Sequence, residues 1–197
     1  MKRTRWIALL VVLAAGGLSA QARQTVGGKD SAVLDVQREK HSLQSLLKLA
    51  ENLVVSTVDA MPADKFGFTP TDGEFKGVRT FAQMVKHLSA TNDILAAAAL
   101  GEEPPREAGD EVGPEAVRTK AEILNYLKES FAHLSRAVEA IGAANVPVNT
   151  SPISPLKKSE VTRSALIVES LFHAADHYGQ LVEYLRMNGV VPPASRP

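Results

Sequence analysis

Two histidines near the end of the sequence are spaced for binding a shared metal ion. His173 and His177 stand four residues apart in a segment whose apolar residues recur with a helical period. Residues four apart lie one turn apart on the same helix face, so two imidazoles at this spacing can bind one ion. In the zinc-protease motif His-Glu-x-x-His a glutamate follows the first histidine, but this chain has Ala174 there. The pair therefore indicates a metal site of another kind, or two histidines without a common ligand.

A third ligand must come from another helix, because two imidazoles alone leave a metal ion incompletely coordinated. His173 and His177 border the apolar side of their predicted helix, and imidazoles that face a bundle interior are costly to bury without a partner. His87 is the best candidate because it borders the apolar stripe of a separate predicted helix. His41 and His133 have mainly polar neighbours, so we predict that both are exposed.

No residue stands out as a general base, and the catalytic residues remain unknown at this stage. Glu169 lies one turn before His173, where it is expected either to orient that imidazole or to be a solvated carboxylate. Gln180 shares the histidine face and is either a hydrogen-bonding group of the site or a packing amide. Gly179 costs a helix about 1 kcal/mol relative to alanine, which predicts the close approach of a neighbouring helix. We expect Tyr178 and Tyr184 to pack at the edge of the hydrophobic core.

Four segments carry apolar residues at a helical period, and the loops between them are rich in proline, glycine or acidic residues. They span about residues 42–60, 80–101, 114–141 and 162–188. Thr80 and Gln83 match the capping box that starts a helix, and Gly189 followed by two prolines predicts where the last helix ends. No segment alternates with the period of a strand. The simplest architecture is all-α, an up-and-down four-helix bundle.

The composition excludes several classes of function. The 197 residues include 22 basic and 22 acidic side chains and no cysteine. The lack of cysteine rules out disulfides, thiolate zinc sites and iron–sulfur clusters. Three of the basic residues and none of the acidic ones lie in the first 22, so the rest of the chain has a net charge of −3. This mildly acidic chain has only 5% aromatic residues, which argues against nucleic acid as a partner.

The first 22 residues have the pattern of a secretory signal. Basic residues are followed by an apolar run over residues 7–15 and by Ser-Ala-Gln-Ala at 19–22, which fits an Ala-x-Ala cleavage site. The run is shorter than the roughly 20 apolar residues that span a membrane. We therefore expect a signal peptide (1–22), an N-terminal tether (23–39) and a helical bundle (40–197). The mature protein is expected to be exported to the periplasm and to have no membrane association after cleavage.

In combination, these motifs resemble the DinB-like superfamily over about residues 40–195. The resemblance rests on His87 in a helix that starts Thr-Phe-Ala-Gln, and on the ending His173-Ala-Ala-Asp-His177-Tyr-Gly-Gln180. A similar turn, Lys-Phe-Gly-Phe-Thr-Pro, lies at 65–70. The resemblance implies a four-helix bundle, often a homodimer, that holds a divalent metal ion through three histidines. The matching positions here are His87, His173 and His177, and zinc and nickel are the ions most expected.

The resemblance also implies two kinds of activity on a small-molecule substrate. Some members of the superfamily are metal-dependent thiol transferases or isomerases, and others are described as metal-dependent hydrolases. Three neutral imidazoles leave coordination positions open, and a divalent ion lowers the pKa of its bound water to about 7. Two alternatives stay open at this point. The bundle either binds metal without turnover, in stress response or ion handling, or is a structural interaction module whose histidines are incidental.

Overall fold

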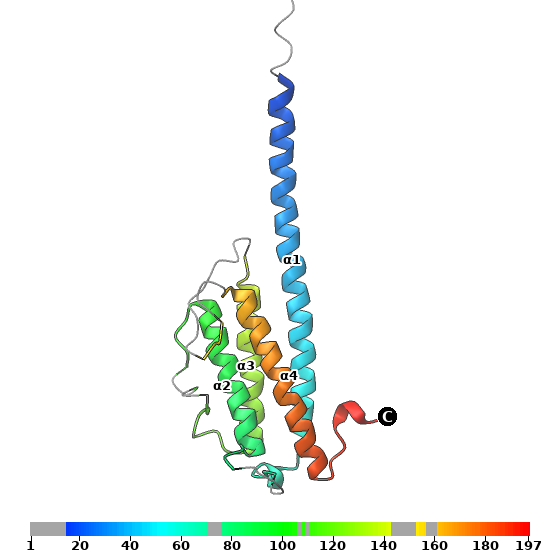
Figure 1. The fold of residues 1–197 in the computed structure, drawn as a ribbon, viewed down its shortest axis with the longest axis vertical. Helices are drawn as coiled ribbons and strands as arrows, with labels where there is room; N and C mark the ends of the chain where they lie inside the picture. Colours follow the sequence, from blue (N-terminus) through cyan, green and yellow to red (C-terminus); the bar gives the residue numbers. More distant parts are fainter. Residues whose placement is uncertain (1–14, 71–75, 106–107, 109–110, 143–152, 157–160) are drawn as a thin grey trace, which may run out of the picture.

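The computed structural model describes residues 15–70, 76–105, 108, 111–142, 153–156 and 161–197. The described residues form four α-helices, α1 (Ala15–Ala60), α2 (Phe81–Leu100), α3 (Lys120–Glu139) and α4 (Arg163–Met187). Figure 1 shows them packed side by side. Two short 3-10 helices lie outside them, η1 (Ala63–Lys65) and η3 (Pro193–Ser195). The predicted all-α four-helix bundle is confirmed.

The predicted up-and-down order is wrong, because the helices do not simply alternate in direction along the chain. Lys120, at the start of α3, donates a hydrogen bond to the carbonyl of Met61 directly after α1, at 3.1 Å. At the opposite end of the bundle, Arg136 of α3 pairs with Glu102 directly after α2, at 2.7 Å. Therefore α2 and α3 run parallel, and the described residues between 101 and 119 belong to a crossover that returns along the bundle from the end of α2 to the start of α3. The apolar period predicts that the helices pack but not the direction in which each one runs.

The candidate histidines lie on two helices that are direct neighbours. Helices α1 and α2 each pack against both α3 and α4. Arg163 at the start of α4 donates to the carbonyl of Ala99 near the end of α2, at 2.8 Å, so α2 and α4 are antiparallel. The largest fully buried side chains are those of Met61, Phe81, Leu88, Leu95, Ile123, Leu127, Phe131, Leu134, Leu166, Ile167, Leu181 and Leu185. All four helices or their ends contribute to this core, which holds α2 and α4 at a defined spacing.

Capping residues determine where α2 starts and where α4 ends. Thr80 accepts a hydrogen bond from the backbone N–H of Gln83 at 3.1 Å, and the Gln83 side chain accepts one from the backbone N–H of Thr80 at 2.8 Å. The predicted capping box is thus confirmed. Gly189 has a φ of 70°, the left-handed conformation expected of the residue that ends a helix.

Helix α3 begins later than predicted. The apolar period suggests a start at Pro114, but the helix starts at Lys120. Thr119 and Glu122 form a second capping box at this point, each side chain satisfying a backbone N–H of the other residue. The residues before Thr119 belong to the crossover.

Helix α1 is much longer than its apolar repeat. Among the residues whose side chains are described, Leu43 is the first buried one. The part before it extends past the ends of the other helices in Figure 1 and includes residues 23–39, the expected tether. Val36 packs against the core, and Glu39 and Lys40 contact Ser164 of α4 and Glu139 of α3. The exposed residues that precede Val36 carry no apolar stripe that would predict a longer helix. The basic and most of the apolar part of the predicted signal peptide, residues 1–14, lies outside the described residues.

Helix α4 corrects one packing prediction and confirms another. Gly179 is exposed, and a Cβ placed there would have no atom within 4 Å, so the predicted close approach of a helix is wrong. Tyr184 is buried and donates its hydroxyl hydrogen bond to the carbonyl of Arg79 at 3.0 Å, while Tyr178 is half-buried against the core. Both tyrosines therefore lie at the edge of the core, as predicted.

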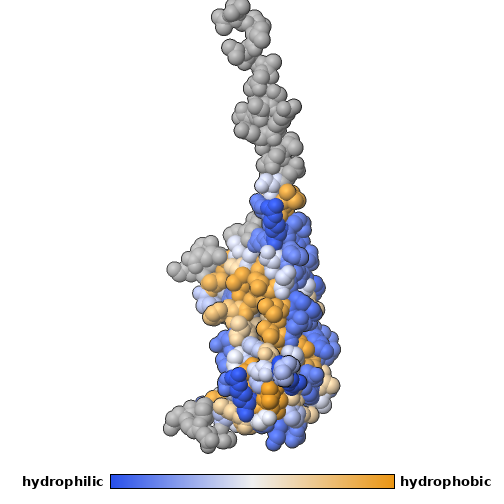
Figure 2. Space-filling model, turned by 90° about the vertical axis from the view of Figure 1, so that its right-hand side faces the viewer, coloured by the Kyte–Doolittle hydropathy of each residue, from blue (hydrophilic) through white to orange (hydrophobic). Residues whose placement is uncertain are grey.

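An apolar groove remains open between α1 and α4. Figure 2 shows apolar surface gathered on this face of the bundle. The groove has a volume of about 220 Å³ and is lined by Leu46, Leu49, Ala50, Leu53, Val54, Leu171, Ala174, Ala175 and Tyr178. Leu46 and Leu49 are each more than half exposed at its rim. No helix in the described part of the chain is long and apolar enough to cross a membrane.

Candidate metal centre

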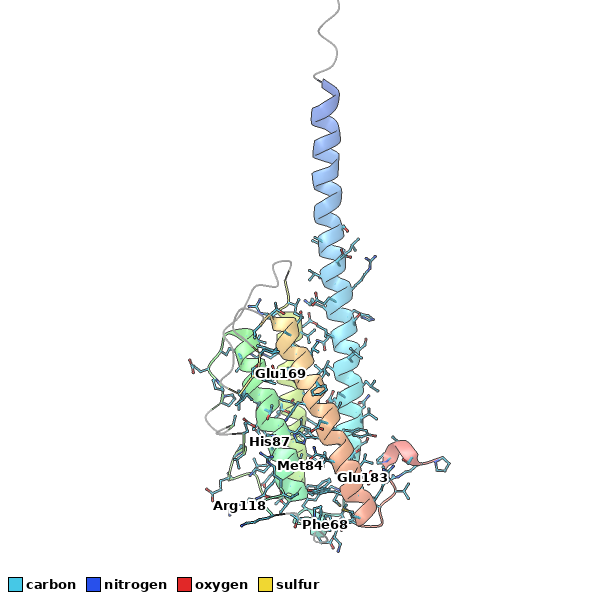
Figure 3. The ribbon with its side chains drawn as sticks, in the orientation of Figure 1. Phe68, Met84, His87, Arg118, Glu169 and Glu183 are labelled. Atoms are coloured by element: carbon cyan, nitrogen blue, oxygen red, sulfur yellow. The ribbon has the colours of Figure 1, made fainter. Side chains whose placement is uncertain are left out.

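Three histidines meet between α2 and α4. The Nε2 atom of His173 lies 3.2 Å from Nε2 of His87 and 2.9 Å from Nε2 of His177. The potential ligand atoms of the three residues all lie within 4.8 Å of one another. His87 comes from the middle of α2, as Figure 3 shows, and the other two come from successive turns of α4. The structure therefore brings together the three residues that the sequence singled out.

The environment keeps the three imidazoles neutral. His87 and His177 are buried, with 5% and 7% of their surface exposed, and His173 is half-buried. Burial lowers the pKa of each ring because the charged form loses its hydration, and the neighbouring histidines lower the pKa of His173 and His177 further. The pKa of His173 falls to about 3. Neutral imidazole is the protonation state that binds a metal ion.

The donor atoms fit a divalent ion. A neutral imidazole has one N–H and one lone pair, so three Nε2 atoms that converge can present three lone pairs to one point. A cation at that point interacts favourably with all three, whereas the lone pairs repel one another without it. Imidazole nitrogens suit zinc, nickel, copper and iron, and the donor set does not select among them. Elsewhere in the described part of the chain, no group of three or more His, Cys, Asp or Glu is arranged in this way.

The crossover supplies the hydrogen-bond partner of His87. The Nδ1 atom of His87 lies 2.8 Å from the backbone carbonyl oxygen of Glu111, and 3.7 Å from the Glu111 carboxylate. Because a carbonyl only accepts, Nδ1 carries the proton and Nε2 presents its lone pair to the other histidines. Sequence reasoning missed this contact. The only signal was an acidic loop, and nothing in its spacing points to α2.

A cavity of about 240 Å³ opens beside His173. Its walls are formed by four apolar residues, three acidic ones, a threonine and His173, namely Leu95, Ile153, Pro155, Phe172, Glu111, Glu169, Asp176, Thr91 and His173. Glu169, labelled in Figure 3, accepts a hydrogen bond from the hydroxyl of Ser154 at 2.8 Å, and burial raises its pKa. Glu169 is therefore not a solvated carboxylate, and it makes no hydrogen bond that would orient His173 in the described part of the chain. It forms part of the cavity wall. Gln180 donates to Asp176, another residue of the cavity wall, at 2.9 Å, and its side chain offsets part of the lowering of the His177 pKa.

The two remaining histidines lie away from the site. His41 is exposed, as predicted. The prediction that His133 is exposed is wrong, because only 12% of its side chain is accessible. Its Nδ1 lies 3.0 Å from the carboxylate of Asp93 and its Nε2 lies 3.5 Å from that of Glu102. The polar neighbours of His133 along α3 gave no sign that α2 packs on this face.

The comparison with protein families agrees with the geometry. Residues 46–181, which include all three clustered histidines, match the model of the DinB superfamily. This match covers more than half of the chain. None of the curated proteins is significantly similar to the chain.

Proposed function

Because the chain belongs to the DinB superfamily, we propose that it is a metalloprotein that holds one divalent ion between α2 and α4. The ligands are the Nε2 atoms of His87, His173 and His177, and zinc and nickel are the ions we expect. The observation that carries this proposal is the convergence of three neutral, largely buried lone-pair donors on one point. Neither ion identity nor activity follows from the family match alone.

We further propose that the protein is a metal-dependent hydrolase acting on a small molecule in the cavity beside His173. When bound by three imidazoles, such an ion has open coordination positions and supplies Lewis acidity and an acidified water. Glu169 supports hydrolysis, because its carboxylate lines the same cavity one turn from His173 and burial raises its pKa, which makes it a stronger proton acceptor than an exposed carboxylate. Thiol transfer at the same site is the second candidate, and a bundle that binds metal without turnover is the alternative to both.

Elemental analysis of protein purified without a metal-binding tag tests the metal site. We expect about one divalent ion per chain, and loss of the ion in His87→Ala and in His173→Ala because either change removes one of three ligands. His41→Ala is the matched control, since His41 is exposed and lies outside the site, and this variant should retain the ion. Wild-type protein that binds neither zinc nor nickel after incubation with each would refute the metal site.

Turnover assays separate the activities. The metal-loaded protein would be assayed against esters, amides and thiol conjugates, with and without a chelator. Hydrolysis that is lost on chelation and in Glu169→Gln, which retains the ion, supports the hydrolase. Transfer of a thiol that does not need Glu169 supports the transferase, and a bound ion without turnover of any compound supports the non-catalytic alternative.

We also propose that the protein is exported and that it forms a homodimer. Export is supported by the basic, apolar and small-residue pattern of residues 1–22, and the mass of the mature protein tests it by showing whether cleavage occurs after residue 22. The dimer is supported by the apolar groove between α1 and α4. Light scattering should show a dimer that dissociates in Leu49→Glu, at the rim of the groove, but not in Val191→Glu, an equally exposed residue after α4.

A further inference from the structure

We infer that the backbone segment Glu111–Gly113 positions His87 as a metal ligand, so that Gly113, which cannot itself bind the ion, controls metal affinity. The inference rests on the proposed metal site and adds a positioning residue to it. It makes a part of the crossover, 24 positions after His87 in sequence, necessary for tight binding.

The three histidines differ in what holds their rings in place. His173 and His177 lie on successive turns of one helix, and the described part of the chain offers no hydrogen-bond partner to the Nδ1 atom of either. His87 stands alone on α2, and its Nδ1 hydrogen bonds to the Glu111 carbonyl at 2.8 Å. This bond selects the tautomer whose Nε2 faces the other two rings. Partners of this kind on ligand histidines commonly change metal affinity by 10- to 100-fold.

The segment adopts a backbone conformation that points the Glu111 carbonyl at His87. Glu111 has a φ of 63° and is the only non-glycine residue with a positive φ in the described part of the chain. Gly113 also has a positive φ, 77°, and its N–H donates to the carbonyl of Ala108 at 3.4 Å. Left-handed residues other than glycine persist where surrounding contacts hold them, and they are frequent at ligand sites. Contacts of the neighbouring Gly113 with α2 can hold Glu111 in this conformation.

Gly113 packs directly against the backbone of α2 next to the ligand. A Cβ at position 113 would lie 3.1 Å from the carbonyl oxygen of Lys86 and 3.3 Å from the ring of Tyr126. Lys86 immediately precedes His87, and its carbonyl is fixed within the helix. A side chain at 113 therefore has to push the segment away from α2. Because Glu111 lies two residues earlier in the same turn, that displacement draws its carbonyl away from His87.

The test measures the zinc affinity of the full chain by competition with a chelator. Gly113→Ala should bind zinc about 10- to 100-fold more weakly than wild type. Gly77→Ala is the matched control, since Gly77 has a similar φ of 81° but no atom within 4 Å of a Cβ, and its affinity should not change. If Gly113→Ala does not fold, Gly113→Asn replaces it, because asparagine tolerates a positive φ while keeping the contact with α2.

Two further measurements identify the backbone as the cause. Glu111→Asn keeps the carbonyl and tolerates the positive φ, so its zinc affinity should stay within about threefold of wild type. A loss in this variant equal to that of Gly113→Ala would assign the effect to the Glu111 carboxylate and overturn the inference. Nitrogen NMR of the metal-free protein should show the His87 proton on Nδ1 in wild type and a mixture of tautomers in Gly113→Ala.

The outcomes separate this inference from the proposed function. If wild-type protein binds no zinc, the proposed metal site fails. If wild type binds zinc and the folded Gly113 variants bind it equally well, the metal site stands and the positioning role is refuted.

Discussion

At the scale of single residues, the three histidines are held in a state that binds a metal and resists protonation. Burial and mutual proximity lower the pKa values of His87, His173 and His177, which favours their neutral forms. The Glu111 carbonyl then settles which nitrogen of His87 bears the proton. Ligand chemistry is thus set by groups around the imidazoles as much as by the imidazoles themselves.

This arrangement predicts a loss of stability in mild acid when metal is absent. In the unfolded chain a histidine titrates near pH 6.5, whereas in the folded protein the pKa of His173 is about 3. Between these values the unfolded state binds more protons, so the free energy of unfolding falls as the pH falls below 6.5. From pH 7 to pH 5 we expect a loss of about 1–2 kcal/mol from this residue.

Urea denaturation in the presence of a chelator measures the effect. The pH dependence should be weaker in His173→Gln, which cannot bind the proton in the unfolded state, and should be unchanged in His41→Gln. Equal slopes in wild type and His173→Gln would contradict the assigned cause.

The residue types and the spacing were sufficient to predict the candidate site. A His-x3-His pair near an apolar stripe and a third histidine near another stripe are local patterns, and these patterns place the rings at one interface once the helices pack. Glu111 could not be predicted in this way. Its role depends on a left-handed backbone and on where a crossover meets α2, and neither is encoded in a repeat.

At the scale of elements, capping boxes and apolar periods predicted the helices themselves. The structure differs from the prediction where residues distant in sequence come into contact. The start of α2 followed from Thr80 and Gln83, whereas the parallel course of α2 and α3 appears only in contacts such as Lys120 with Met61. The part of α1 that projects past the other helices had no apolar stripe that would predict it. His133 was misplaced for a related reason, since its partner Asp93 lies on another helix.

The α2–α3 interface should depend on His133 without any effect on metal binding. His133→Ala removes the partner of Asp93, whose side chain is only 11% exposed, and leaves its carboxylate buried without that hydrogen bond. We expect a loss of about 1–3 kcal/mol in the free energy of unfolding. Elemental analysis of the variant should still show one ion per chain, and loss of the ion would mean that the two histidine sites are coupled.

Replacing Gly179 in helix α4 with alanine should stabilise the protein. Because this glycine is exposed, helical and without neighbours within 4 Å of a Cβ, alanine should fit without strain. Gly179→Ala is expected to raise the free energy of unfolding by about 0.5–1 kcal/mol by reducing the entropy of the unfolded chain. Urea denaturation at pH 7 tests this. A destabilised variant would show that position 179 has contacts which the structure does not display.

At the scale of the whole molecule, the bundle should be independent of the N-terminal part of α1. No buried side chain precedes Leu43 among those described, and this part of the helix extends beyond the other three in Figure 1. Deletion of residues 1–30 should therefore leave the melting temperature within about 2 °C of the full-length value, since surface changes away from packed groups have small effects. Calorimetry of the two forms tests this, and a much lower melting temperature would show that the projecting helix has a partner.

His173 follows His87 by 86 positions, and this separation gives the proposed ion a mechanical role as well as a chemical one. An ion bound by both His87 and His173 would close a long loop of the chain. A cross-link that closes a long loop reduces the conformational entropy of the unfolded chain more than one that closes a short loop. This chain contains no cysteine and so cannot form a disulfide, which leaves coordination as its route to a cross-link of this kind. A free ion at 100 times its dissociation constant would stabilise the folded state by about 2.7 kcal/mol. Metal supply would then regulate how long the protein survives proteolysis.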